Sequence, residues 1–169
     1  MDTNLRLAGV IRESIVDGPG WRLVVFAQGC PHHCEGCQNP QTHDFTGGYD
    51  STVQNILDAV KANKLLAGIT LSGGEPFAQA KAMSKLAHEI HKIGLNVMAY
   101  SGWTFEQLFN GANNQNYWLD LLNEVDFLVD GKFDIDKKSL SVKFRGSSNQ
   151  RIIDVKKSLA INYAVETEL

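Results

Sequence analysis

Short apolar runs alternate with helical segments along this chain, and this alternation limits the folds that it can adopt. Runs that are almost continuously apolar are typical of strands covered on both faces, as in parallel sheets. Strands separated by helices are expected to pair in parallel through right-handed crossovers. The runs rich in branched residues are 22–28, 68–71, 95–100, 125–129 and 151–155.

The length of the chain decides how far such a sheet can extend. A closed eight-stranded barrel takes about 250 residues, whereas this chain has 169. We therefore expect an α/β fold of the incomplete (β/α) barrel type, a mostly parallel, curved sheet of about five or six strands with helices outside. Because domains usually contain about 100–200 residues, residues 1–169 are expected to form a single domain.

Segments of helical periodicity lie between the strands. Their residues are 53–60, 83–93, 104–109 and 118–123. Capping boxes are expected at two of them, from Ser51 with Gln54 and from Thr104 with Gln107. Gly94 is expected to cap the C-terminal end of the second segment, because glycine adopts the left-handed conformation there without strain.

Composition and charge exclude several classes of protein. With 43% hydrophobic and 21% charged residues the chain can bury a core. No stretch without Asp, Glu, Lys or Arg exceeds 13 residues, which is short of the roughly 18 that a membrane helix needs. Residues 1–6 contain no apolar signal region, so we expect a cytoplasmic protein. The net charge of −3 argues against nucleic-acid binding as the main role.

All three cysteines lie within eight residues, at Cys30, Cys34 and Cys37. An odd number of crowded thiols does not form a disulfide framework, and thiolates favour zinc or iron–sulfur clusters. Structural zinc requires four ligands, so His32, His33 or His43 would have to complete the site. A 4Fe–4S cluster on three cysteines leaves one iron open to a small ligand. We favour the cluster, with zinc second and a thioredoxin-type pair third.

Unusual segments follow the first four predicted strands. They are 29–37, which contains the cysteines, 72–76 (SGGEP), 101–103 (SGW) and 130–133 (DGKF). The carboxyl ends of parallel strands lie at one edge of a sheet, where ligand sites form. The four segments are therefore expected to surround one pocket.

The segment 72–76 contains groups that suit a small zwitterionic ligand. Gly73 and Gly74 allow close approach to the backbone, and Glu75 can accept a hydrogen bond from an ammonium group. Taken alone, each glycine motif is more typical of a tight turn. No Walker A loop or dinucleotide fingerprint is present.

Together, C-x3-C-x2-C and the SGGE motif resemble the radical S-adenosylmethionine enzymes. The stretch DGPGWRLVVFAQGC further resembles the activases of glycyl radical enzymes. LSGGEPF, YSGWTFEQL, VDFLVDGKFD and FRGSSNQRIID are similar to the subgroup that activates the anaerobic ribonucleoside-triphosphate reductase. The resemblance covers residues 17–154.

The resemblance implies a chemistry and two cofactors. Cys30, Cys34 and Cys37 are expected to hold a 4Fe–4S cluster whose fourth iron is chelated by S-adenosylmethionine. Reductive cleavage of that cofactor gives a 5′-deoxyadenosyl radical, which abstracts hydrogen from a glycine of the reductase's catalytic subunit. A flavodoxin-type protein supplies the electron. No catalytic residue is expected beyond the ligands of the cluster and the cofactor.

The resemblance also implies which residues bind S-adenosylmethionine. Gly73, Gly74 and Glu75 match the motif that binds its methionine end. Gly36 and Gln38, which flank Cys37, match backbone that lines the adenine, and the three are expected to contact the cofactor. Ser101 stands at the third strand end, where the family approaches the cofactor.

Three later residues are expected to contact the reductase. Asp130 and Lys132 follow the fourth strand, where a lysine can reach a peptide carbonyl or carboxylate of the entering glycine loop. Arg145 can hold a backbone segment with its several donors.

Other residues have plainer interpretations. His32 and His33 are expected to be solvated, and Trp21, Trp103 and Trp118 to serve packing or a partner surface. Two other functions stay open: activation of another glycyl radical enzyme of the pyruvate formate-lyase type, and a non-catalytic Cys3His zinc module.

Overall fold

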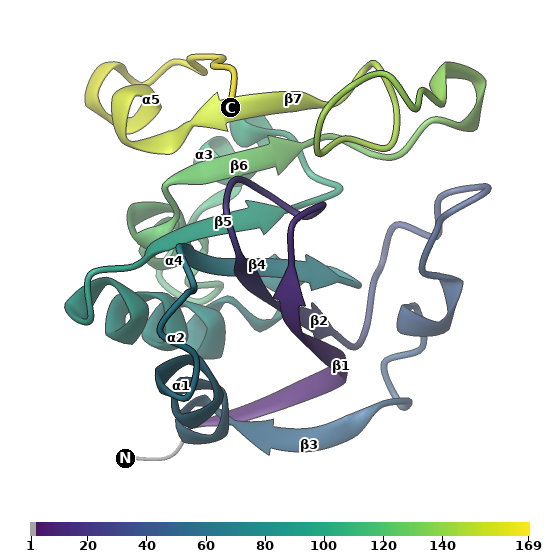
Figure 1. Cartoon of the computed structure of the whole chain (residues 1–169). Helices are drawn as coiled ribbons and strands as arrows, with labels where there is room; N and C mark the ends of the chain where they lie inside the picture. The colour runs from purple at the N-terminus through teal and green to yellow at the C-terminus, as the bar shows by residue number, and fades with distance from the viewer. Residues whose placement is uncertain (1–2) are drawn as a thin grey trace.

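Parallel strands form the centre of the sheet in the computed structural model, which describes residues 3–169. They are β2 (Arg22–Ala27), β4 (Gly68–Gly73), β5 (Asn96–Tyr100) and β6 (Phe127–Asp130). Their pairing is in parallel throughout, with Val24 opposite Thr70 and Thr70 opposite Met98. These four strands coincide, to within two residues at each end, with the first four predicted runs. Their arrowheads point to the same side in Figure 1.

Antiparallel strands extend the sheet at both sides. They are β1 (Asn4–Ser14), β3 (Tyr49–Thr52) and β7 (Arg151–Asp154). The order is β3-β1-β2-β4-β5-β6-β7, so the sheet is open, with β3 and β7 at its edges. The prediction of about five or six strands is wrong, because the sheet has seven. The prediction of a mostly parallel sheet is also wrong, because three of the six strand pairings are antiparallel.

The two missed strands lack the apolar run that predicts a buried strand. β3 reads YDST and is half-exposed or exposed along its length. β1 buries Leu5 and Leu7 but is interrupted by charged residues and by two irregularities in its pairing with β2. The pairing of β3 with β1 through backbone hydrogen bonds leaves no periodic mark in the sequence, and the two buried leucines of β1 are too few to form an apolar run.

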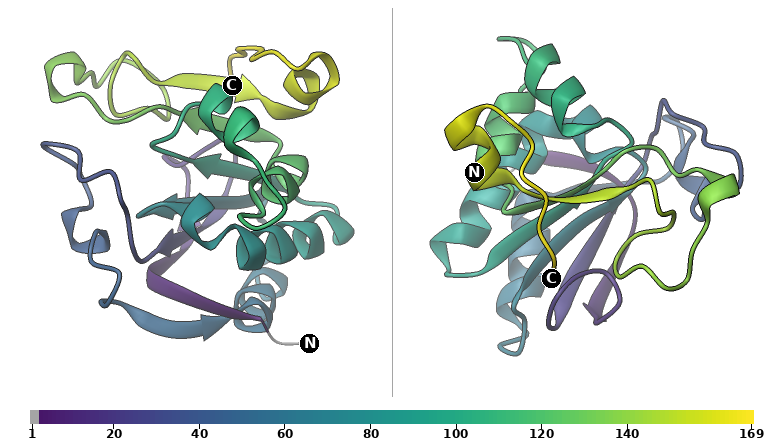
Figure 2. Two further views of the ribbon diagram at one scale, coloured as in Figure 1. Left: turned by 180° about the vertical axis from the view of Figure 1, so that it is seen from behind. Right: turned by 90° about the horizontal axis from the view of Figure 1, so that it is seen from above.

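Helices pack against one face of the sheet (Figure 2). They are α1 (Val53–Lys61), α2 (Ala80–Lys92), α3 (Phe105–Gly111), α4 (Trp118–Glu124) and α5 (Val155–Ile161). The capping box of Thr104 and Gln107 and the C-terminal turn at Gly94 are confirmed. The box expected at Ser51 is wrong, since Thr52 caps α1 and Ser51 belongs to β3. Within residues 3–169 no helix is long and apolar enough to cross a membrane.

The opposite face of the sheet is covered by irregular segments. Met98, Val129 and Ile152 form a small apolar cluster there, against which Phe144 and Leu169 pack. Further along this face Arg22 is fully buried, and its guanidinium donates to Thr70 Oγ1 at 2.8 Å and to the carbonyls of Pro19 and Ile69. Burial lowers the pKa of Arg22 to about 10.

The C-terminal segment lies along the free edge of β7. The amide of Asp154 donates to the carbonyl of Val165 at 2.8 Å, and the amide of Thr167 donates to the carbonyl of Ile152 at 2.9 Å. Ile153 and Glu166 form an isolated antiparallel bridge. The last residues therefore act as a short additional strip beside β7.

Candidate functional site

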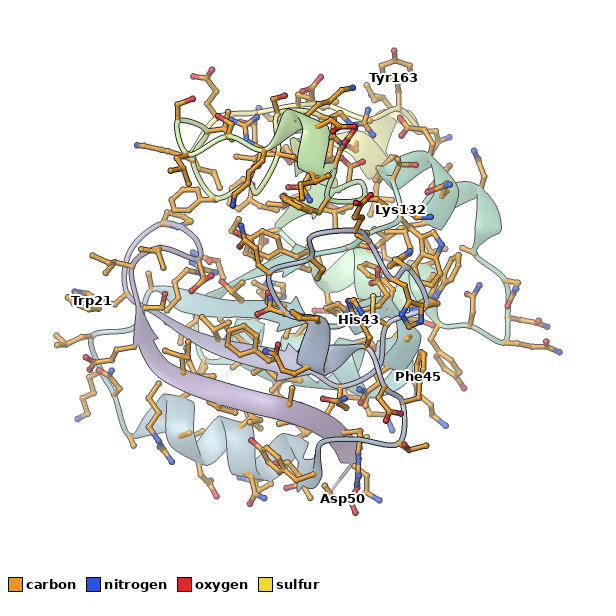
Figure 3. The ribbon with its side chains drawn as sticks, turned by 90° about the vertical axis from the view of Figure 1, so that its right-hand side faces the viewer. Trp21, His43, Phe45, Asp50, Lys132 and Tyr163 are labelled. Carbon is orange, nitrogen blue, oxygen red and sulfur yellow. The ribbon has the colours of Figure 1, made fainter. Side chains whose placement is uncertain are left out.

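The segments that follow the parallel strands meet at one edge of the sheet, as the sequence predicts. The amide of Glu75 donates to the carbonyl of Gly29 at 2.9 Å, which joins the ends of β4 and β2. The amide of Gly131 reaches the carbonyl of Trp103 at 3.3 Å, which joins the segments after β6 and β5. Figure 3 looks onto this edge, with His43 near its centre and Lys132 above it.

The cysteine loop begins directly after β2 and is fixed at its start. The amide of Gly29 donates to the carbonyl of Thr42 at 2.6 Å, and the amide of Cys30 donates to the carbonyl of His43 at 3.1 Å. Cys30 is buried, Cys34 and Cys37 are half-buried, and all three are free thiols. The amide of Asn39 donates to Cys37 Sγ at 3.4 Å.

Burial and neighbouring charges determine how readily these thiols ionise. Burial raises the pKa of Cys30, while backbone N–H groups of His32 and His33 partly oppose it. Burial likewise raises the pKa of Cys34, against the N–H of Phe133 and the positive charge of nearby Lys132. N–H groups directed at cysteine sulfurs are a usual feature of iron–sulfur sites. Three thiols on one loop with such donors fit a thiolate-held cluster.

The histidines that a zinc site would need have the following neighbours. The rings of His33 and His43 pack edge to face with centroids 5.0 Å apart, and His32 is bound to Glu75. In the part of the chain that the structure describes, no three His, Cys, Asp or Glu side chains, the three cysteines included, are arranged to hold a single metal ion.

Glu75 is fully buried and joins three of the strand ends. Its Oε1 lies 2.7 Å from His32 Nε2 and accepts from Ser101 Oγ and the amide of Gly102, each at 2.8 Å. Its Oε2 accepts from the amide of Phe77 at 3.0 Å, at the start of a short 3-10 helix. The carboxylate thus ties the cysteine loop to the segments after β4 and β5.

The expectation that His32 is solvated is wrong. Its side chain is only 5% exposed and is held between Glu75 and the ring of Trp103. A histidine beside a proline in a cysteine loop is ordinarily taken as exposed, and nothing in the sequence identifies the buried carboxylate that it meets. Gly102 was also missed as a donor to Glu75, because its amide is invisible in a residue pattern.

Gly73 and Gly74 have structural roles in the backbone between two strand ends. A Cβ on Gly74 would collide with the carbonyl of Gly29, and one on Gly73 would lie 2.6 Å from the amide nitrogen of Ala27. Gly73 also has a φ of 88°, a conformation that favours glycine. The absence of side chains at Gly73 and Gly74 therefore allows the end of β4 to pack closely against the end of β2.

The residues expected to line the adenine lie on the outer part of the loop. Gly36 and Gln38 are exposed and Cys37 is half-buried. Gly36 has a φ of 71°, and a Cβ there would collide with the side chain of Ile135. The cysteine loop therefore lies directly against the segment that follows β6.

The residues expected to contact a partner lie in different surroundings. Asp130 is buried and bound to Arg151, whose Nε is 3.0 Å from Oδ1, and it accepts from the amide of Phe105 at 2.7 Å. Lys132 is exposed in a cleft of about 540 Å³ that also includes Glu35 of the cysteine loop. Arg145 borders another cleft, beside Glu166 and Glu168, which shares no lining residue with the first.

Comparison with known proteins agrees with a cluster-binding role for the cysteine loop at this edge. A family model described as a 4Fe-4S single cluster domain matches residues 16–153, so the chain belongs to the class of proteins that contain this kind of domain. The anaerobic ribonucleoside-triphosphate reductase-activating protein of Escherichia coli K12 is 36% identical over 146 residues, which cover 80% of this chain and 90% of that protein. This chain belongs to the family of anaerobic ribonucleoside-triphosphate reductase-activating proteins.

Relatives from other sources bear the same name. That of Vibrio cholerae is 30% identical over 82% of this chain and 90% of its own length. That of Enterobacteria phage T4 is 31% identical over 81% of this chain and 86% of its own length. Among solved structures, QueE from Escherichia coli matches 60% of this chain and 53% of its own, with 15% identity and a TM-score of 0.48.

Proposed function

We propose that this protein activates the anaerobic ribonucleoside-triphosphate reductase by forming a glycyl radical on its catalytic subunit. The observation that carries the proposal is the meeting of the cysteine loop with the Glu75 network at the carboxyl edge of the parallel strands. The names of relatives that cover most of the chain supply the target. All of residues 1–169 would serve as one domain, an incomplete (β/α) barrel working in the cytoplasm.

Cys30, Cys34 and Cys37 would hold the 4Fe–4S cluster, with no fourth protein thiolate. When bound, the cluster supplies one electron to S-adenosylmethionine, and the chemistry ends in removal of hydrogen from a glycine of the reductase. The N–H groups directed at Cys30 and Cys37 stabilise negative charge on the sulfurs. The protein's own contribution is to hold the reacting partners in contact and apart from water.

Gly73, Gly74 and Glu75 would bind the methionine end of S-adenosylmethionine. Glu75 already has four hydrogen-bond donors, so its main action is to fix the cysteine loop against the segments after β4 and β5. Ser101 would act through Glu75, because its hydroxyl donates to that carboxylate.

The outer part of the loop supplies the remaining contacts of this proposal. Gly36, Cys37 and Gln38 would present backbone groups to the adenine, since they lie at the accessible side of the loop.

Lys132 would meet the glycine loop of the reductase at the cleft beside the cysteine loop. A flavodoxin-type protein would deliver the electron. Asp130 would act there only through Arg151, to which its buried carboxylate is bound.

The test is anaerobic reconstitution followed by three measurements: iron and sulfide content, 5′-deoxyadenosine formed from S-adenosylmethionine, and the electron paramagnetic resonance signal of a glycyl radical. The reductase subunit should give the radical signal, whereas a pyruvate formate-lyase type enzyme should not. Cys30→Ala, Cys34→Ala and Cys37→Ala should each abolish 5′-deoxyadenosine formation, because two thiolates hold the cluster poorly. A colourless, zinc-loaded protein would contradict the proposal.

A further inference from the structure

A row of aromatic rings connects the cysteine loop with the helical side of the sheet. The ring of His32 lies edge-on against Trp103, with centroids 4.6 Å apart. Trp103 in turn packs against Trp118, the first residue of α4, with centroids 4.7 Å apart. His32 belongs to the cysteine loop, two positions from both Cys30 and Cys34. Ring contacts are therefore continuous from a histidine of the cysteine loop to a tryptophan at the start of α4.

The outer end of this row opens into a surface cleft. Trp103 and Trp118 both line a cleft of about 720 Å³, together with the beginning of α2. Both tryptophans are half-buried, so an approaching molecule can contact their rings. The left view of Figure 2 shows α2 and α4 on this face, which is turned away from the viewer in Figure 1.

The cleft is positively charged on a chain whose net charge is −3. Lys81 and Lys85 line it, and its described lining includes no Asp or Glu. Within residues 3–169 neither lysine forms an ion pair. The two lysines also line a neighbouring cleft, whose lining does contain carboxylates. The ammonium of Lys81 lies 5.3 Å from the centre of the Tyr117 ring, which holds that charge at the rim.

We propose that an acidic one-electron carrier protein docks on this cleft, and that its electron reaches the cysteine loop through Trp118, Trp103 and His32. The inference rests on the proposed function, which requires one electron for each cleavage. One electron leaves the carrier and one arrives at the cluster that the cysteines hold. No bond forms or breaks, no proton moves, and the rings are contacts for tunnelling that are not themselves oxidised. Because tunnelling weakens steeply with distance, packed rings are a better path than solvent.

The docking site is tested by the double variant Lys81→Gln/Lys85→Gln. Two exposed charges lost from an electrostatic contact should weaken the Kd of flavodoxin for the reconstituted protein about tenfold and make it less dependent on salt. The matched control is Lys156→Gln/Lys157→Gln, which removes two exposed lysines from α5. An unchanged Kd for the first variant, or an equal loss in the control, would overturn the assignment of this surface.

The electron path is tested by Trp103→Leu and Trp118→Leu, with Trp103→Phe as the variant that keeps a ring. Reduction of the cluster is followed by its absorbance, once with reduced flavodoxin and once with dithionite, which is small enough to need no docking. At saturating flavodoxin, where a weaker Kd no longer limits the rate, the leucine variants should lose most of the rate with flavodoxin, whereas their rate with dithionite should fall much less. Trp103→Phe should retain most of the flavodoxin rate.

The two donors separate failure of the path from failure of the proposed function. Leucine variants that accept electrons from flavodoxin as fast as the parent would overturn the aromatic path. A parent protein that is reduced by neither donor, or that cleaves no S-adenosylmethionine after reduction by dithionite, would overturn the proposed function instead. Thermal melting of each variant confirms that the comparison is between folded proteins.

Discussion

Glu75 shows how a single buried side chain can determine the shape of a site. A carboxylate removed from water is costly unless donors surround it, and this one accepts four hydrogen bonds from its neighbours. Those donors come from the cysteine loop and from the segments after β4 and β5. Losing one donor therefore affects both the stability of the chain and the position of the loop.

His32→Leu is expected to lower the free energy of unfolding by about 1–3 kcal/mol, because it leaves the buried carboxylate short of one donor. Urea denaturation of the parent and the variant measures the difference. His33→Leu is the matched control, since His33 is exposed and adjacent in the same loop. Equal denaturation midpoints for His32→Leu and the parent would show that the carboxylate does not depend on this histidine.

Gly74→Ala is expected to disturb the cysteine loop, because the added methyl group meets the carbonyl of Gly29, one residue before Cys30. Overpacking of this kind costs about 1–3 kcal/mol, and iron content after reconstitution should fall with stability. Gly9→Ala is the control, since nothing lies within 4 Å of a Cβ at Gly9. Full iron content with weakened binding of S-adenosylmethionine would show that Gly74 contacts the ligand without positioning the cysteine loop.

The helical layer is joined to the sheet by a histidine at the end of α2. His91 Nδ1 lies 3.0 Å from Glu124 of α4, and its Nε2 lies 2.8 Å from Asp126, just before β6. Asp126 also accepts from the amide of Val97 in β5 at 2.8 Å. His88, on the same helix, makes a second contact with Glu124 at 3.1 Å. One imidazole thus connects two helices with two strands.

Stability should therefore depend on pH through His91. Burial opposes its charge, but the hydrogen bonds to Asp126 and Glu124 outweigh burial and leave the pKa of His91 raised. A raised pKa in the folded state contributes stability that is complete below about pH 6.5 and is lost as pH rises through the folded value. The free energy of unfolding should fall between about pH 6 and pH 8 more steeply for the parent than for His91→Leu.

If the free energy of unfolding depended on pH equally in the parent and in His91→Leu, His91 would not be the source of the pH dependence. His88→Leu is the control, because its side chain is 60% exposed and reaches one carboxylate only. It should therefore leave most of the pH dependence in place.

Strands and helices could be predicted where each buries a continuous apolar face. β2, β4, β5 and α2 carry such faces, and their ends agree with the predictions to within a few residues. β3 could not be predicted, because it pairs through its backbone and carries polar side chains. The N-cap of α1 was predicted at Ser51 but is Thr52. Ser51 lies within β3, which continues up to the start of the helix.

The meeting of the four strand ends could be predicted because it follows from the direction of parallel strands. Their side-chain partners could not, since the Glu75–His32 and Asp130–Arg151 contacts join residues 43 and 21 positions apart. Neither pair leaves a local pattern. The assignment of the three cysteines to a cluster, by contrast, rests on a local pattern of three thiols in eight residues and stays a prediction.

Lys132→Ala is expected to form much less glycyl radical on the reductase than the parent, while 5′-deoxyadenosine formation without the reductase falls much less. Its charge lies in the cleft beside the cysteine loop, where a peptide loop must enter. Arg145→Ala is the comparison, because Arg145 borders a different cleft and should affect the radical less. Equal and normal radical signals in both variants would remove Lys132 from the partner surface.

The strip that residues 165–167 form beside β7 has a practical consequence for work with this protein. The free backbone groups of an edge strand attract other chains, and here the chain's own last residues occupy them. Shortening the chain would uncover both that edge and the apolar cluster on which Leu169 rests. Preparations with trimmed ends would then tend to precipitate or to grow into filaments, so an affinity handle is better attached at the other terminus.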